Sequence, residues 1–158
     1  MSYQPIKVEF VNPFLDATNA VFKTMLNTEL KRGALYLRQG VPQSHEISGI
    51  IGLSGKAKGT VLIGMSSEFA IAATNRLLGE QAEGLTPEVI DAVGELANMI
   101  AGGAKTRLEE LNMSISLPSV IAGKNHSVSF PSGAVPIGIP FESDLGSFAV
   151  EVSLVEVT

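Results

Sequence analysis

The sequence contains no cysteine and only two histidines, His45 and His126, in 158 residues. The absence of cysteine excludes disulfides, thiol nucleophiles and thiolate metal sites, and the two histidines do not have the spacing of metal ligands. No run of lysine or arginine occurs and the formal charge is −5, so the basic footprint of a nucleic-acid-binding protein is missing. We therefore predict a protein that holds no metal of its own and binds no nucleic acid.

Long hydrophobic runs are also missing, although 45% of the residues are hydrophobic. Glycine, serine or a charged residue interrupts every apolar stretch before the roughly 18 residues that a membrane span needs. The first ten residues have neither the basic start nor the apolar run of a signal peptide. We therefore expect a cytoplasmic protein that does not contact a membrane, with residues 1–158 forming a single domain around one core.

Capping residues predict three helices. Asn12-Pro13 is typical of an N-cap followed by proline in the first turn, and predicts a helix that runs to about Leu30. Ser66 or Ser67 as the cap, with Gly79 as the left-handed exit, predicts a second helix through Leu78. Thr86-Pro87-Glu88 predicts the start of a third helix, which is long and reaches about Leu111.

Strand-like segments lie between and after these helices. The two segments 46–54 and 60–65 are joined by five residues with glycine at both ends, which predicts a hairpin loop. The order of a long helix, a strand and a hairpin occurs twice, so we predict two diverged repeats in a two-layer α+β domain with a mainly antiparallel sheet. The complete set of predicted strands is 6–11, 34–39, 46–54, 60–65, 114–122, 127–130, 135–141 and 148–157.

The third helix carries a polar stripe. Asp91, Glu95, Asn98 and Gly102 are separated by four, three and four positions, which places them within an arc of about 60°. The residues predicted to face the core lie on the opposite side: Val89, Val93, Leu96, Ala97, Ile100, Ala104 and Leu111. A solvated helix surface would explain the polar residues taken alone.

Glycine makes a docking surface the better interpretation of this stripe. Gly94, Gly102 and Gly103 lie within the same helix, and each costs roughly 0.5–1 kcal/mol relative to alanine in a helix interior. Asn98 is also a poor residue for the middle of a helix that only faces water. We therefore predict that another protein backbone approaches this helix closely.

The stripe lies within DAVGELANMIAGGAK, which resembles the signature helix of the CheC/CheX/FliY family of receiver-domain phosphatases. The resemblance extends over nearly the whole chain, through NPFLDATNAVF, GIIGLSGKAKGTVLIGMS and LPSVIAGKNH. One complete signature rather than two indicates the CheX branch.

The resemblance implies that Glu95 and Asn98 act on a phosphorylated, CheY-like receiver domain. Asn98 would position the attacking water and Glu95 would pair with a lysine of the receiver, while Asp91, Gly94, Gly102 and Gly103 would form the docking surface. The receiver supplies Mg²⁺, and this chain needs no cofactor of its own. The resemblance also implies a homodimer, formed by pairing of edge strands.

The first helix contains a degenerate copy of the motif. Asn12, Asp16, Asn19 and Lys23 repeat the four-three-four spacing, but Asp16 is one methylene shorter than glutamate and Lys23 occupies the position of the small residue. Because a long side chain opposes close docking, we predict that this copy is inactive.

Two other functions stay open at this point. The protein could be a non-catalytic adaptor that binds a receiver or another signalling partner through the same helix. It could also be a structural homodimer in which the exposed helix packs against a neighbouring copy.

Overall fold

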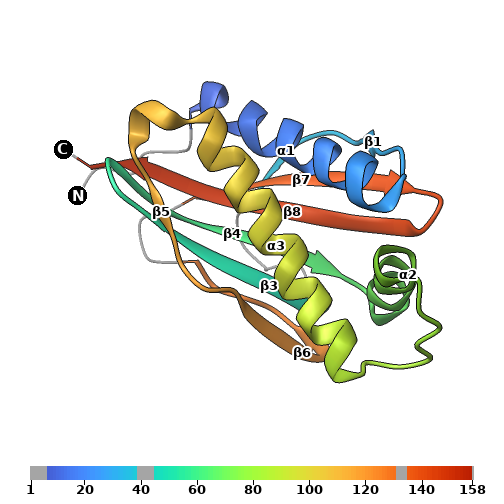
Figure 1. The fold of residues 1–158 in the computed structure, drawn as a ribbon. Coiled ribbons are helices and arrows are strands. Elements are labelled where there is room, and N and C mark those ends of the chain that lie inside the picture. The colour runs from blue at the N-terminus through green and yellow to red at the C-terminus, as the bar shows by residue number, and fades with distance from the viewer. Residues whose placement is uncertain (1–6, 39–44, 131–134, 158) are drawn as a thin grey trace.

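The computed structural model describes residues 7–38, 45–130 and 135–157, in which three α-helices accompany one sheet (Figure 1). The helices are α1 (Val8–Leu26), α2 (Ser67–Leu78) and α3 (Pro87–Arg107), and a 3₁₀ turn, η1 (Glu109–Leu111), follows α3. The strands are β1 (Lys31–Arg32), β2 (Tyr36–Leu37), β3 (His45–Ser54), β4 (Ala57–Met65), β5 (Ser114–Ile115), β6 (Ser119–His126), β7 (Ile137–Ser143) and β8 (Gly146–Glu156).

The sheet is antiparallel and its strand order reveals the two repeats. The order is β1-β7-β8-β4-β3-β5, with β2 also paired to β7 and β6 also paired to β3. The hairpins β3-β4 and β7-β8 meet at the centre, where β4 pairs with β8 from Ala57↔Glu156 to Met65↔Phe148. The short strands of each repeat pair with the hairpin of the other repeat. The predicted α+β fold with two helix–strand–hairpin units is confirmed.

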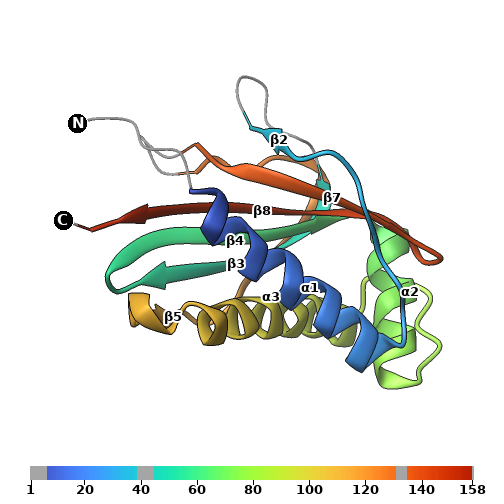
Figure 2. The same ribbon diagram turned by 90° about the horizontal axis from the view of Figure 1, so that it is seen from above.

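Helices α1 and α3 lie side by side on one face of the sheet, while α2 covers one end (Figures 1 and 2). The core fills the space between this helix layer and the sheet. The Phe22 ring of α1 stacks on Phe148 of β8 with the ring centroids 4.7 Å apart. Every residue predicted to form the apolar side of the third helix is buried.

The caps of α2 and α3 agree with the prediction. The Ser66 hydroxyl accepts a hydrogen bond from the Phe69 N–H at 3.1 Å, and Gly79 ends α2 with φ +67°. The Thr86 hydroxyl accepts from the Val89 N–H at 3.3 Å. The α-helix then ends at Arg107 and not at Leu111, because the last residues tighten into η1.

The predicted start of α1 is wrong, since the helix begins at Val8 and Pro13 lies inside it. Phe10 and Val11 are buried by this extension, and such side chains contribute roughly 1.5–3 kcal/mol each. That burial offsets a proline that costs about 3 kcal/mol within a helix. The helix also ends earlier than predicted, at Leu26, because Asn27 adopts the left-handed conformation.

Three predictions about strands differ from the structure. Only Gly55-Lys56 separates β3 from β4, because Ser54 pairs with Ser114 of β5 and Ala57 pairs with Glu156 of β8, although the last pair between β3 and β4 is Leu53↔Gly59. A Cβ at Gly55 would meet the backbone of Asn112, so only glycine fits this turn. Residues 127–130 do not form a strand, and residues 8–11, predicted as part of a short strand or an extended arm, belong to α1.

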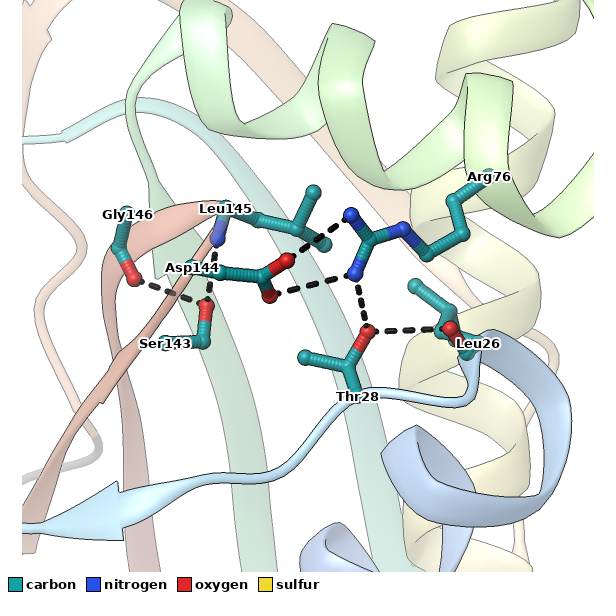
Figure 3. Close-up of polar contacts among 7 residues, drawn as sticks. All are labelled: Leu26, Thr28, Arg76, Ser143, Asp144, Leu145 and Gly146. Carbon is teal, nitrogen blue, oxygen red and sulfur yellow. Dashed lines mark hydrogen bonds and ion pairs between the residues drawn. The ribbon is translucent and has the colours of Figure 1, made fainter.

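An ion pair joins α2 to the turn between β7 and β8 (Figure 3). The Arg76 guanidinium donates to both carboxylate oxygens of Asp144 at 3.1 and 2.9 Å, and to the Thr28 hydroxyl at 2.8 Å. These contacts fix α2 against the segment that follows α1. Within the described ranges, no helix is long and apolar enough to cross a membrane.

Candidate functional site

The structure places the predicted polar stripe on the side of α3 that faces away from the sheet. Val93 and Ala97 lie on the sheet side, where a Cβ at Gly49 of β3 would come within 3.0 Å of the Ala97 methyl carbon. Glu95 is exposed and Asn98 is half-buried. The helix therefore presents a carboxylate and a carboxamide outward, one turn apart, from a rigid element.

The side chains of Glu95 and Asn98 are available to a partner protein. Among the residues that the structure describes, the side chains of Asp91, Glu95 and Asn98 make no hydrogen bond or ion pair. A carboxamide both donates and accepts hydrogen bonds without carrying a charge. Asn98 can therefore orient a water molecule, while Glu95 can pair with a cation that a partner supplies.

The three glycines of α3 have different surroundings. A Cβ at Gly102 would find nothing within 4 Å, so this position forms a flat spot on the exposed stripe. A Cβ at Gly94 would lie 3.2 Å from Val120 of β6, and one at Gly103 would lie 3.0 Å from Ala17 of α1. The small size of Gly94 and Gly103 therefore serves packing within the chain, and their docking role stays a prediction.

The degenerate stripe lies on α1. Asp16, Asn19 and Lys23 are all exposed, and α1 packs beside α3 where Gly103 meets Ala17. The helix layer thus presents both stripes to solvent. The long Lys23 side chain stands at the position that corresponds to the open Gly102.

The two histidines, far apart in the sequence, lie opposite each other on β3 and β6. The Nε2 atom of His126 lies 2.8 Å from the Ser48 hydroxyl, and its Nδ1 atom lies 2.7 Å from the Gly123 carbonyl oxygen. Burial lowers the pKa of His45, and the nearby positive charges of His126 and Arg38 act in the same direction. In the described part of the chain, no group of three or more His, Cys, Asp or Glu residues is arranged to hold a metal ion.

A buried polar cluster escaped the sequence analysis. Arg38 donates to the Glu151 carboxylate at 3.0 Å, and the Tyr36 hydroxyl donates to its other oxygen at 3.3 Å. Burial raises the pKa of Glu151, and the charge of Arg38 opposes this rise. A Cβ at Gly138 of β7 would collide with the Tyr36 ring, so this glycine leaves room for the cluster.

Comparisons with known proteins give this geometry a context. The family model described as chemotaxis phosphatase CheX matches residues 47–142. A CheC-like superfamily protein from Shewanella sp. PV-4 is 38% identical and superimposes with a TM-score of 0.87, over 94% of this chain and 99% of that one. The CheY-P phosphatase CheX of Thermotoga maritima is 27% identical over 73% of this chain and 76% of its own length. The structure of a CheX-CheY-BeF₃-Mg²⁺ complex from Borrelia burgdorferi matches with a TM-score of 0.81 at 27% identity, covering 95% of this chain and all of that one.

Proposed function

Because the chain belongs to the chemotaxis phosphatase CheX family, we propose that it hydrolyses the aspartyl phosphate of a CheY-like receiver domain. The observation that carries this proposal is the outward-facing Glu95–Asn98 pair, which has no partner among the described residues and lies next to the open Gly102. The named activity of the Thermotoga maritima relative and the CheX-CheY complex support the same substrate class.

In the proposed reaction, water attacks the phosphorus atom of the receiver's aspartyl phosphate. The bond between phosphorus and the aspartate oxygen breaks, which gives a free carboxylate and inorganic phosphate. The Asn98 carboxamide accepts a hydrogen bond from this water and holds it in line, a contribution of positioning rather than of charge. No covalent intermediate forms on this chain.

Glu95 fixes the register of the two proteins by pairing with a lysine of the receiver. Such an interfacial pair couples by about 1.5–7 kcal/mol when it is desolvated. The receiver holds the Mg²⁺ that neutralises charge on the phosphoryl oxygens. Gly102 lets the receiver backbone approach α3, because no side chain stands between them.

The test is the rate of phosphate release from a CheY-like receiver that has been phosphorylated by a small phosphodonor in Mg²⁺. We expect Asn98→Ala to slow the reaction by about 10²–10³, as loss of one transition-state hydrogen bond does, with much less effect on binding. Asn19→Ala on α1 is the matched control and should leave the rate unchanged. Saturable binding without acceleration by the wild-type protein would contradict the proposal and identify an adaptor.

We also propose that the protein forms a homodimer through the edge strand β6. In the described ranges β6 pairs only with β3, and its residues Ile121 and Ala122 are exposed. This exposed edge carries one charged side chain, Lys124, and its outer row of backbone N–H and C=O groups is a template for strand pairing. Sedimentation equilibrium should give twice the 16.6 kDa mass of the chain, and a monomer at all concentrations would refute it.

A further inference from the structure

We propose that Leu117 is a docking residue that anchors the receiver domain beside the Glu95–Asn98 stripe. This inference rests on the proposed function and adds to it a contact surface outside the signature helix. Leu117 lies in the short segment between β5 and β6 and is 88% exposed, the largest value among the large hydrophobic residues that the structure describes.

The stripe alone is too small to bind a protein domain. From Asp91 to Gly102 it spans eleven residue steps, or roughly 17 Å, and a helix is about 10 Å wide, so it offers on the order of 170 Å². A specific interface covers about 800 Å² on each partner. A receiver that reaches Asn98 must therefore also contact the surfaces on either side of α3.

The segment that carries Leu117 forms one of these two sides. The ring of Pro118 lies 3.6 Å from the Cβ position of Gly94, one helical turn before Asn98 on the same flank of α3. Ser116, Leu117, Pro118 and Ser119 are all exposed. A receiver domain seated on Asn98 would therefore lie close to this segment on that side of α3.

The other side of α3 is the α1 helix, which differs in chemistry. Its outward residues include the polar and exposed Asp16, Asn19 and Lys23, and its exposed large hydrophobic residues, Val8 and Met25, lie at its two ends and are less exposed than Leu117. Binding energy concentrates in a few residues that lose their water on contact, while polar rim residues contribute little. Of the two sides of α3, the side that carries Leu117 therefore offers the better anchor for the receiver.

Leu117 is also held rigidly, which lowers the entropy cost of binding. The Ser116 N–H donates to the Gly52 carbonyl at 2.9 Å, and the Gly52 N–H donates to the Ser116 hydroxyl at 2.8 Å. The same hydroxyl donates to the Leu117 carbonyl at 2.9 Å. Pro118 fixes the next backbone angle. The exposed side chain thus projects from a backbone that is already ordered.

The experiment is a KM-against-kcat comparison of Leu117→Ser with the wild-type protein, using a phosphorylated CheY-like receiver as substrate. We expect KM to rise about tenfold or more, as for loss of one buried leucine contact, while kcat stays within about twofold. Leu37→Ser is the matched control, because Leu37 is also exposed but lies on β2 at the opposite edge of the sheet. Its KM should not change.

Three other outcomes would overturn the inference. An unchanged KM in Leu117→Ser, with Asn98→Ala still inactive, would refute the docking role and leave the proposed function standing. A change in sedimentation that parallels the change in KM would show that Leu117 contacts a second copy of this chain. Absence of any phosphatase activity in the wild-type protein would refute the proposed function itself, and the docking role with it.

Discussion

Arg38 and Glu151 form an ion pair in which both side chains are almost completely buried, with 6% and 0% of their side-chain surfaces exposed. Arg38 follows β2, whereas Glu151 lies near the middle of β8. The pair therefore fixes Arg38, the residue directly after β2, to the sheet. Arg38 also donates to the Val128 carbonyl and lies over the Phe130 ring, so it joins three distant parts of the chain.

Removing Arg38 should destabilise the fold in a pH-dependent way. Burial places the folded-state pKa of Glu151 above its ordinary value of 4.5, so the folded protein binds this proton more readily than the unfolded chain. The free energy of unfolding therefore falls as pH rises through the interval between the two pKa values. Arg38→Met raises the folded pKa further and extends that interval upward. We expect a loss of about 3–5 kcal/mol at pH 7.5 and a smaller loss at pH 5, measured by urea unfolding.

The double variant Arg38→Met/Glu151→Gln separates the pH dependence that comes from Glu151 from any that comes from His45. The positive charge of Arg38 also lowers the pKa of His45, and both variants remove that influence equally. We expect the double variant to show little of the extra pH dependence. If Arg38→Met lowered the free energy of unfolding equally at pH 7.5 and pH 5, the pH dependence would not come from Glu151.

The open position at Gly102 predicts a conflict between stability and function. Alanine is favoured over glycine in a helix by roughly 0.5–1 kcal/mol, and a Cβ at Gly102 meets nothing within 4 Å. Gly102→Ala should therefore raise the free energy of unfolding by about that amount. The same methyl group should lower phosphatase activity, because the proposed receiver backbone approaches here.

Gly103→Ala is the control in the same helix. Its Cβ would lie 3.0 Å from the Ala17 methyl carbon, so close packing against α1 cancels the gain in helix propensity. We expect no stabilisation from this variant. If Gly102→Ala gained stability and kept full activity, the small residue would have no role in docking.

The sequence predicts best those features that depend on a few adjacent residues. The Ser66 and Thr86 caps, Gly79 and the stripe of α3 all follow from local spacing, and the structure has them where expected. The start of α1 does not, because burial of Phe10 and Val11 against distant residues decides it. The residues next to Pro13 do not show whether burial in the folded chain outweighs the cost of a proline inside the helix.

The buried cluster illustrates the same limit more sharply. Residues 150–154 alternate between apolar and polar residues, which predicts that Glu151 faces water. The structure covers it with Tyr36 and Arg38, more than 100 positions earlier in the sequence. The packing roles of Gly94 and Gly103 could not be predicted from local sequence either, since their neighbours Val120 and Ala17 belong to other elements.

Glu95→Gln should weaken recognition of the receiver more than it slows the chemical step. Glutamine keeps the size of the side chain but removes the charge that the proposed receiver lysine requires. Breaking a desolvated charge pair costs about 2–5 kcal/mol, so kcat/KM should fall by at least about tenfold, mainly through KM. The wild-type kcat/KM should also decrease with added salt, because salt screens the pair. In Glu95→Gln that dependence should be weaker.

Glu109→Gln removes the same charge from an exposed residue of η1. It changes the net charge of the protein equally but lies beyond the end of α3, so it controls for long-range attraction between the two proteins. We expect its kcat/KM to stay close to that of the wild-type protein at every salt concentration. Matching losses in the two variants would mean that Glu95 contributes only to the overall field, and that another residue of the stripe sets the register with the receiver.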